Sequence, residues 1–259
     1  MKPQTKQFER QFIRRRDAIE RKGISIYKRA LAEQYNYVLS RLRSTDFRQW
    51  VELVDSIPEK PIEDAFYRFY PMNAPLGTME YLHLKQGKAT DEEKKLNSVF
   101  SLKLTNIVRT KCGDKIKTIT STSKDKIKQI IRDVIDQGET EGIGIPEMTS
   151  RLFKTVGQNL RGNGYARAKA IAQTEVISAS NQASEYAAYS TGYAYKKFWS
   201  TSGLPNIRET HIEAEQYSDS VGGLLPDETF PNGLLYPGDP AGDVYELVNC
   251  RSTLIHELI

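Results

Sequence analysis

The spacing of apolar residues predicts a helical N-terminal region. From about Gln4 to Leu42, apolar residues recur at near-helical steps, and Lys and Arg occupy the other faces. Gly23 is the point at which this run could divide into two helices. The apolar stripe consists of Phe8, Phe12, Ile19, Ile26, Ala30 and Val38. Because the stripe is narrow and the basic face is broad, we expect the segment to dock on another surface rather than form a core alone.

The middle of the chain continues the helical period. Thr90 and Glu93 have the spacing of a capping box for the helix that follows them. The polar stretch 118–123 is predicted to be a linker, and 124–157 a pair of amphipathic helices, the first of which stops at Gly138. The aromatic and basic segment 67–71 could stack on single-stranded nucleic acid. Packing between helices is the commoner use of such aromatics, and we favour it.

The last hundred residues combine one long helix with many turns. The longest helical signal runs from about Tyr165 to Tyr189, with small residues along one side and Gly192 in the position of a helix-ending residue. Residues 193–201 alternate and are rich in β-prone side chains. Gly, Pro, Asn and Asp then dominate, which predicts short strands and turns. The pattern as a whole predicts a mainly helical α+β chain, with long N-terminal helices followed by a compact C-terminal domain.

These patterns divide the sequence into three predicted regions. Residues 1–123 form a helical N-terminal region, of which 1–45 is a basic arm, and residues 124–164 form a helical pair that leads into a C-terminal domain, 165–259.

Charge is distributed unevenly along the chain. Residues 1–45 hold twelve Lys or Arg and four acidic residues, whereas the chain from Pro205 onward holds two Arg and ten acidic residues. This asymmetry indicates that the two ends face different partners. A solvated helix face and an acidic loop surface would have the same composition, so this alternative stays open.

The cysteine count and the apolar runs bear on the compartment. Cys112 and Cys250 cannot build a disulfide framework or a metal knuckle, which favours a reducing compartment. No apolar run approaches the roughly 18 residues of a membrane span, and the first residues lack a signal-type hydrophobic segment. We therefore expect a protein that is made in a cytoplasm, does not enter a membrane, and stays soluble or joins an assembly.

The C-terminal third contains seven short motifs. In chain order they are R-A-K-A-I-A-Q-T-E at 167–175, Asn181, Gly192 with K-F-W at 197–199, R-E-T-H at 208–211, F-P-N-G at 230–233, Y-P-G-D-P at 236–240 and N-C-R at 249–251. In this order they resemble the head-morphogenesis domain of phage Mu protein F-like minor head proteins. Ser252 stands where members commonly have a further Cys, and 213–216 replaces their usual D-G-x stretch. The second departure marks a divergent member.

The resemblance implies a role in a virus particle. A protein of this family would be a minor capsid protein of a tailed double-stranded DNA phage, made in the bacterial cytoplasm and located in the head interior or at the portal vertex. Its partners would be the portal protein, the major capsid protein or both, with non-specific contacts to packaged DNA. It would act in head assembly, DNA packaging or DNA ejection.

We interpret the motif residues as a structural clamp that ties the loop-rich tail to the long helix. Thr174 and Glu175 would bond backbone groups of the following loops, and Arg208 or Arg251 would pair with Glu175. Trp199 would be the main apolar anchor. The predicted clamp consists of Arg167, Thr174, Glu175, Asn181, Trp199, Arg208, His211, Asn249, Cys250 and Arg251.

Two sharper interpretations of the tail are weaker. A zinc ion could be held by His211, Cys250 and His256, but with Ser252 in place of a further cysteine only one thiolate remains. Acid–base chemistry could use His211 with Glu209, Glu213 or Glu215, and a divalent ion could gather Asp219, Asp227, Asp239 and Asp243 for hydrolysis of nucleic acid or peptidoglycan. No recognised nuclease, protease or NTPase spacing is present. We expect no cofactor and no enzymatic activity. A host-directed effector ejected with the DNA is a third alternative.

The basic arm is the predicted contact surface. Arg14, Arg15, Arg16, Arg21 and Lys22 could touch DNA phosphates without reading sequence, or dock on an acidic face of a portal or capsid protein. The sequence does not separate these two uses.

Overall fold

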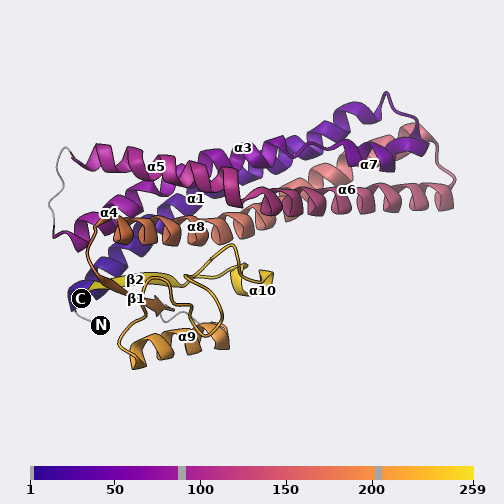
Figure 1. The fold of residues 1–259 in the computed structure, drawn as a ribbon. Coiled ribbons are helices and arrows are strands. Elements are labelled where there is room, and N and C mark those ends of the chain that lie inside the picture. Colours follow the sequence, from indigo (N-terminus) through magenta and orange to yellow (C-terminus); the bar gives the residue numbers. More distant parts are fainter. Residues whose placement is uncertain (1–2, 87–91, 202–205) are drawn as a thin grey trace. The chain divides into compact units, whose positions relative to one another are not determined.

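The computed structural model describes residues 3–86, 92–201 and 206–259, most of which lie in helices (Figure 1). The α-helices are α1 (Pro3–Leu42), α2 (Trp50–Leu53), α3 (Lys60–Phe69), α4 (Ala74–Leu84), α5 (Glu92–Lys111), α6 (Gly113–Glu141), α7 (Ile145–Arg161), α8 (Asn163–Ser190), α9 (Glu209–Ser220) and α10 (Val244–Leu247). Three short 3-10 helices are η1 (Phe47–Gln49), η2 (Val54–Ser56) and η3 (Tyr70–Asn73). Strands β1 (Tyr195–Ser200) and β2 (Thr253–Leu258) form an antiparallel pair. The predicted mainly helical α+β class is confirmed.

The chain forms two compact units that do not follow its order. Unit 1 contains Met1–Gly23, Arg68–Lys111 and Ala170–Ile259, and unit 2 contains Ile24–Tyr67 and Cys112–Lys169. These units differ from the predicted regions 1–123, 124–164 and 165–259. The reason is that α1, α3 and α8 each contribute residues to both units, which a reading of successive segments does not detect.

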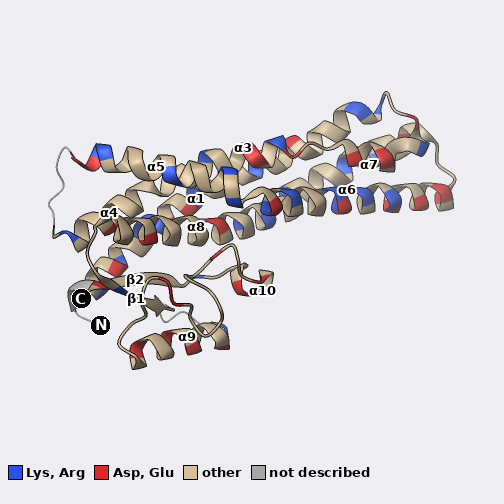
Figure 2. Cartoon of the chain, in the orientation of Figure 1, with Lys and Arg blue, Asp and Glu red and all other residues tan. Residues whose placement is uncertain are grey.

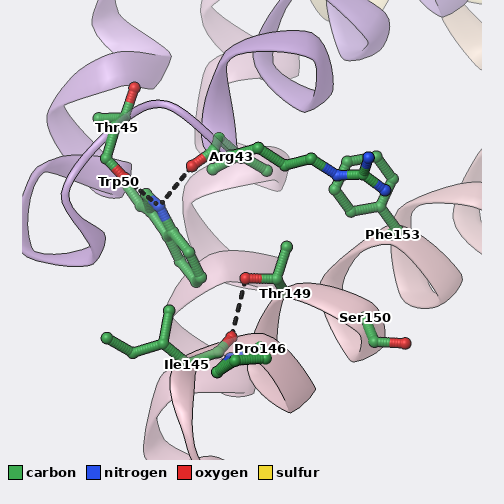
Figure 3. A pocket seen from close by; sticks show the side chains of 9 residues that line it. Arg43, Thr45, Trp50, Ile145, Pro146, Thr149, Ser150 and Phe153 are labelled. Carbon is green, nitrogen blue, oxygen red and sulfur yellow. Dashed lines mark hydrogen bonds between the residues drawn. The ribbon is translucent and has the colours of Figure 1, made fainter.

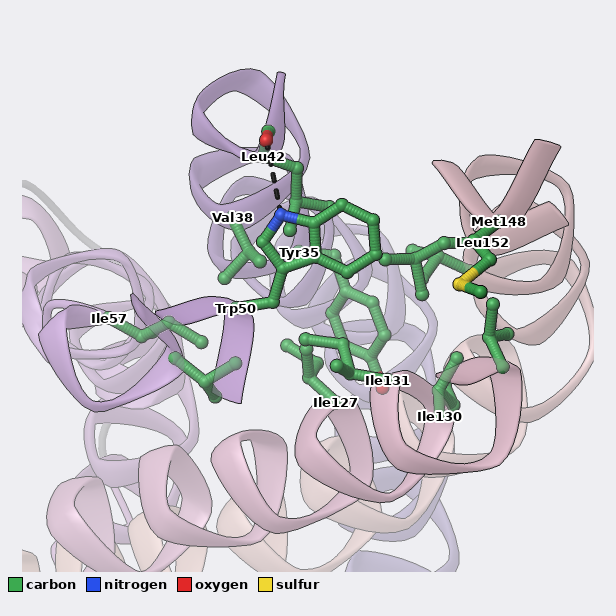
Figure 4. Close-up of a cluster of buried hydrophobic side chains, with 13 residues drawn as sticks. Tyr35, Val38, Leu42, Trp50, Ile57, Ile127, Ile130, Ile131, Met148 and Leu152 are labelled. Carbon is green, nitrogen blue, oxygen red and sulfur yellow. Dashed lines mark hydrogen bonds between the residues drawn. The ribbon is translucent and has the colours of Figure 1, made fainter. Parts of the chain in front are cut away.

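Unit 2 is built around one apolar core (Figure 4). Trp50 is 1% exposed and lies among aliphatic side chains of α1, α6 and α7, including Val38, Ile131 and Leu152. The indole N–H of Trp50 donates to the carbonyl oxygens of Leu42 (3.3 Å) and Thr45 (3.2 Å). A ring of this size buries a large apolar area, and its one polar atom is satisfied.

The predicted linker at 118–123 is wrong, because these residues lie inside α6. Thr120 and Ser123 are buried and bond the side chain of Gln34 on α1: Gln34 Nε2 donates to Thr120 Oγ1 (3.1 Å), and Ser123 Oγ donates to Gln34 Oε1 (2.7 Å). A polar composition resembles a loop, but here the hydroxyls serve a buried polar contact between helices.

Glycines predicted to interrupt helices instead allow close packing. Gly23 lies within an unbroken α1, and Gly138 lies within α6, which continues to Glu141. A Cβ on Gly23 would come within 2.3 Å of the Phe69 ring, and one on Gly138 within 2.7 Å of Met148. Gly142 caps the C-terminal end of α6, and its φ of +67° lies in the left-handed region that glycine adopts readily.

Unit 1 contains the small sheet and the helices around it (Figure 1). The pairing runs from Tyr195 opposite Leu258 to Ser200 opposite Thr253, so the predicted strand at 193–201 is confirmed. Helix α9 lies beside β1, and α4 lies beside β2. Gly192 ends α8 with a φ of +71°, as predicted.

The first part of α1 completes the core of unit 1. Phe8 and Phe12 pack with Leu76 of α4, and Phe12 is only 1% exposed. Phe69 and Tyr70 are fully buried, which fits the packing interpretation of the aromatic segment. Thr90 of the predicted capping box lies outside the described residues. Within the described part of the chain, no helix combines the length and the apolar character needed to cross a membrane.

Candidate functional site

The long helix α8 is the element onto which the loops of the tail are fastened. Asn181 Nδ2 donates to the carbonyl oxygens of Pro237 (2.9 Å) and Ser252 (3.3 Å), and its Oδ1 accepts from the backbone N–H of Leu254 (3.0 Å). One turn or more before it, Thr174 Oγ1 accepts from the backbone N–H of Asn249 (3.2 Å). These contacts satisfy backbone groups of segments with little regular structure.

Asn249 occupies a turn, as its residue type predicts. Its φ is +58°, in the left-handed region that asparagine tolerates better than most residues. The turn directly follows α10 and brings Cys250 and Arg251 back toward the sheet.

The ion pairs of the tail differ from the predicted ones. Glu175 was expected to pair with Arg208 or Arg251, but its carboxylate accepts from the hydroxyl of Tyr70 (2.6 Å). Arg251 instead forms an ion pair with Glu20 of α1. Arg208 donates to the carbonyl oxygen of Val248, and its guanidinium lies 5.2 Å from the centre of the Tyr245 ring. These partners lie far apart in sequence, so no local pattern indicates them.

Arg16 belongs to the clamp and not to the exposed basic face. It is 2% exposed, and its guanidinium donates to Thr253 Oγ1 (2.8 Å) and to the carbonyl oxygens of Arg251 (3.2 Å) and Ser252 (3.5 Å). Burial lowers the pKa of Arg16 to about 10. Its predicted contact with DNA or a partner is therefore wrong, because the side chain is enclosed between α1 and the start of β2.

The other four basic residues of the arm are exposed. Arg14, Arg15, Arg21 and Lys22 face solvent on α1, and no described residue forms an ion pair with any of them.

Arg167 acts in the other compact unit. Its guanidinium donates to Ser123 Oγ (2.9 Å) and to the carbonyl oxygen of Ile119, and so binds α8 to α6 within unit 2. The motif residues from Thr174 onward belong to unit 1. The predicted clamp is thus divided between two separate networks.

Trp199 and His211 form the centre of the tail's own core. Trp199 is 1% exposed and meets the rings of His211 and Phe230 edge-on, with centroids 5.0 Å and 5.1 Å away. His211 is 2% exposed. The predicted anchoring role of Trp199 agrees with this packing.

His211 has three polar neighbours, one at Nε2 and two at Nδ1. Its Nε2 lies 2.9 Å from Glu246 Oε2, and its Nδ1 lies 3.4 Å from Ser252 Oγ and 3.9 Å from Cys250 Sγ. The sequence interpretation had named Glu209, Glu213 and Glu215 as neighbours of His211, but Glu215 bonds Thr201 instead. Glu246 belongs to none of the sequence motifs, so the sequence does not predict its contact with His211. Ser252 stands out in the sequence only because it departs from the family motif.

The surroundings of His211 and Cys250 disfavour the charged form of each side chain. Burial, with a smaller contribution from Arg208, lowers the pKa of His211, although Glu246 acts in the opposite direction. A neutral His211 that donates from Nε2 to Glu246 leaves Nδ1 as an acceptor for Ser252 or Cys250. Burial also raises the pKa of the Cys250 thiol, which is 1% exposed. A protonated, enclosed thiol is a poor nucleophile and metal ligand.

His256 lies in a second buried site. Its Nδ1 is 3.0 Å from Glu80 Oε1 and its Nε2 is 3.0 Å from Glu185 Oε2. Burial alone would lower the pKa of His256, but the hydrogen bonds and charges of the two carboxylates raise it to about 9. The imidazole is therefore a cation held between two anions.

The three proposed zinc ligands do not share one site. His211 and Cys250 are neighbours, with Nδ1 and Sγ 3.9 Å apart, whereas His256 bonds Glu80 and Glu185. Across 3–86, 92–201 and 206–259, no group of three His, Cys, Asp or Glu side chains has an arrangement that could hold a metal ion. The same finding applies to the aspartates that the hydrolase alternative would gather.

Unit 2 has a surface groove of about 500 Å³ that the sequence did not indicate (Figure 3). Trp50, Ile145 and Phe153 give it apolar walls, and the Arg43 guanidinium lies 5.2 Å from the centre of the Phe153 ring. The hydroxyl of Thr149 donates to the carbonyl oxygen of Ile145 (2.8 Å). The groove contains no residue of the motifs and no pair of groups suited to acid–base or nucleophilic chemistry.

Taken together, the motif residues His211 and Cys250 are buried, and Thr174 and Asn181 hold the loops of the tail to α8. Sequence comparison adds no identification: no protein-family model, no curated protein and no solved structure matches this chain.

Proposed function

We propose that this chain is a minor head protein of a tailed double-stranded DNA phage, similar to the phage Mu protein F-like family. It works by binding the portal protein or the major capsid protein, and acts in head assembly, DNA packaging or DNA ejection. The family proposal comes from the ordered motifs between Arg167 and His256.

One observation supports binding over catalysis. Three tail residues capable of acid–base or nucleophilic chemistry are buried and bonded within the protein: His211, Cys250 and His256 are each 1–2% exposed. A hydrolase of nucleic acid or peptidoglycan needs reactive groups that a polymer can reach. Groups enclosed in this way stabilise the compact tail, so binding to a partner would use exposed residues instead.

The exposed basic face of α1 is the proposed binding surface. Arg14 and Arg15, and one turn or more later Arg21 and Lys22, face solvent in unit 1. Arginine and lysine at this density attract carboxylates of a protein or phosphates of DNA. Their contacts with DNA would be independent of sequence and weakened by salt.

A binding experiment with a matched control tests the proposal. The purified chain is mixed with the portal protein, the major capsid protein and a short DNA duplex, and the affinity of each pair is measured. The variant Arg14→Glu/Arg15→Glu should weaken at least one of these interactions by tenfold or more. The control Lys94→Glu/Lys95→Glu reverses an adjacent pair of exposed lysines on α5, and should leave the affinity unchanged.

Failure of the proposal has a clear form. If the unmodified chain binds neither the portal nor the capsid protein, and infectious particles lacking the gene contain normal heads with normal DNA, the chain is not a minor head protein. Phosphodiesterase or peptidoglycan-cleaving activity that is lost in His211→Ala would replace binding by the hydrolase alternative.

A further inference from the structure

A second surface in unit 1 has the opposite charge. An open groove of about 700 Å³ lies at the end of α9. We call it the acidic groove, and its defining residues are Lys196, Tyr217, Val221, Leu225, Asp227 and Glu228.

The acidic groove exposes apolar side chains next to carboxylates. Tyr217, Val221 and Leu225 are each 46% exposed. Asp227 and Glu228 lie beside them, and Figure 2 shows further acidic residues along α9, where Glu213 and Asp219 face solvent. Glu213 and Tyr217 lie four residues apart on α9, and Val221, the residue that caps the end of this helix, follows at the same step, so the three share one stripe. Exposed apolar residues gathered in one hollow indicate a contact surface.

The chemistry of the acidic groove selects a basic occupant. Lys and Arg side chains have apolar stems and charged heads, so they can cover Val221 and Leu225 while the head reaches Asp227 or Glu228. An aromatic ring such as that of Tyr217 adds attraction for a cation. Among the residues that the structure describes, Lys196 is the one basic residue that lines the groove. An acidic or purely apolar segment would leave carboxylates unpaired on burial, which is unfavourable.

The chain itself carries a surface of this kind. Arg14 and Arg21 lie seven residues apart on α1, as do Arg15 and Lys22, so the four side chains form two adjacent stripes. All four are exposed, and the apolar residues of the acidic groove are exposed as well. Within a single copy, therefore, neither surface covers the other.

We propose that the acidic groove of one copy binds the basic face of α1 of a second copy. The two surfaces are different, so the contact is heterologous and repeats from copy to copy, which produces a closed ring or an open row. The complementary excess charge of the two ends favours this pairing and makes it sensitive to salt. The inference goes beyond the proposed function and does not depend on it. Both use the basic face of α1, so a second copy competes for that face with the portal, capsid or DNA partner.

The test measures the oligomeric state of the full chain by sedimentation velocity over a range of concentrations. Unmodified protein should associate at low ionic strength and dissociate in about 0.5 M salt, where charges are screened over a few ångströms. Two variants reverse one surface each: Arg14→Glu/Arg15→Glu/Arg21→Glu/Lys22→Glu on α1, and Asp227→Lys in the groove combined with Glu213→Lys on α9 beside it. Each variant alone should associate at least tenfold more weakly, because its two surfaces then have the same sign.

Mixing the two reversed variants gives the decisive result. In the mixture, each surface of one variant faces an oppositely charged surface of the other, so association should return. Asp136→Lys/Glu139→Lys reverses exposed acids on α6 and should behave as the unmodified chain. Circular dichroism checks that every variant is folded.

Several outcomes overturn the inference. It fails if the unmodified chain is a monomer at every concentration, if either reversed variant still associates normally, or if the mixture stays monomeric. If self-association fails, the proposed function is still testable by itself. The variant Glu213→Lys/Asp227→Lys keeps the basic face of α1 unchanged, so it should still bind the portal, capsid or DNA partner. Loss of partner binding in that variant would show instead that the groove is the partner site.

Discussion

At the scale of single residues, the pKa values of two buried histidines are shifted in opposite directions. The pKa of His211 is lowered and that of His256 is raised to about 9. Both are enclosed, so burial favours the neutral form in each case. The difference comes from charge, since His211 has one carboxylate neighbour and a nearby arginine, whereas His256 lies between two carboxylates.

This difference predicts how stability depends on pH. The folded pKa of His256, about 9, lies above its ordinary value of 6.5, so the proton is bound more tightly in the folded state. Its contribution to the free energy of unfolding is complete below pH 6.5 and is lost as the pH rises through 9. The size of this contribution is on the order of 3 kcal/mol.

Urea unfolding between about pH 6 and pH 9 measures the effect. The groups that face His256 are Glu80, Glu185 and Tyr195, and Lys197 is its cross-strand neighbour. Burial acts to raise the pKa of Glu185, but the hydrogen bond and charge of His256, the charge of Lys197 and the bond from Tyr195 together lower it, so this carboxylate stays charged across the range. His256→Gln should reduce stability and flatten the curve. An equally steep decline in that variant would show that another group is responsible.

At the scale of elements, glycines in helices have different roles although they look alike in sequence. A Gly→Ala change in a helix normally stabilises by about 0.5–1 kcal/mol. Gly23 contradicts this expectation, because a Cβ would come within 2.3 Å of the Phe69 ring. Gly113, at the start of α6, has nothing within 4 Å of a Cβ.

Gly23→Ala should therefore destabilise the protein by about 1–3 kcal/mol through overpacking, while Gly113→Ala should be neutral or stabilising. Thermal unfolding of the two variants beside the unmodified chain measures the difference. Equal effects of the same sign would mean that Gly23 does not lie against Phe69.

At the scale of the whole molecule, the basic arm cannot be separated from the fold. Helix α1 places Phe8, Phe12 and Arg16 in the core of unit 1, and Tyr35, Val38 and Leu42 in the core of unit 2. The arm is therefore a structural element with one exposed basic face.

Deletion of residues 1–45 should abolish cooperative folding. Each large apolar side chain removed from a core costs about 2–5 kcal/mol, whereas a whole domain has only about 5–15 kcal/mol of stability. Far-UV circular dichroism during heating measures the result, and full-length Arg14→Glu/Arg15→Glu is the control, with an unchanged transition. A deletion variant that still melts cooperatively near the original temperature would contradict the observed packing of α1.

The sequence by itself determined features that depend on neighbouring residues. Helical periods predicted α8 and the helices of 124–157, alternation at 193–201 predicted β1, and Gly192 ended its helix in the left-handed conformation. These features follow from backbone geometry and the 3.6- and two-residue periods, which are local. The sequence also identified the exposed basic residues of α1, apart from Arg16.

The tertiary structure alone decided which polar groups are paired and which segments share a core. Arg16 bonds Thr253 across 237 positions and Tyr70 bonds Glu175 across 105, and the polar stretch 118–123 became a buried contact with Gln34. The partner of a buried charge is set by packing and by the cost of leaving it unpaired. Residues so far apart in the chain leave no local pattern, so only the folded arrangement showed that the motifs of the tail form a clamp with α1.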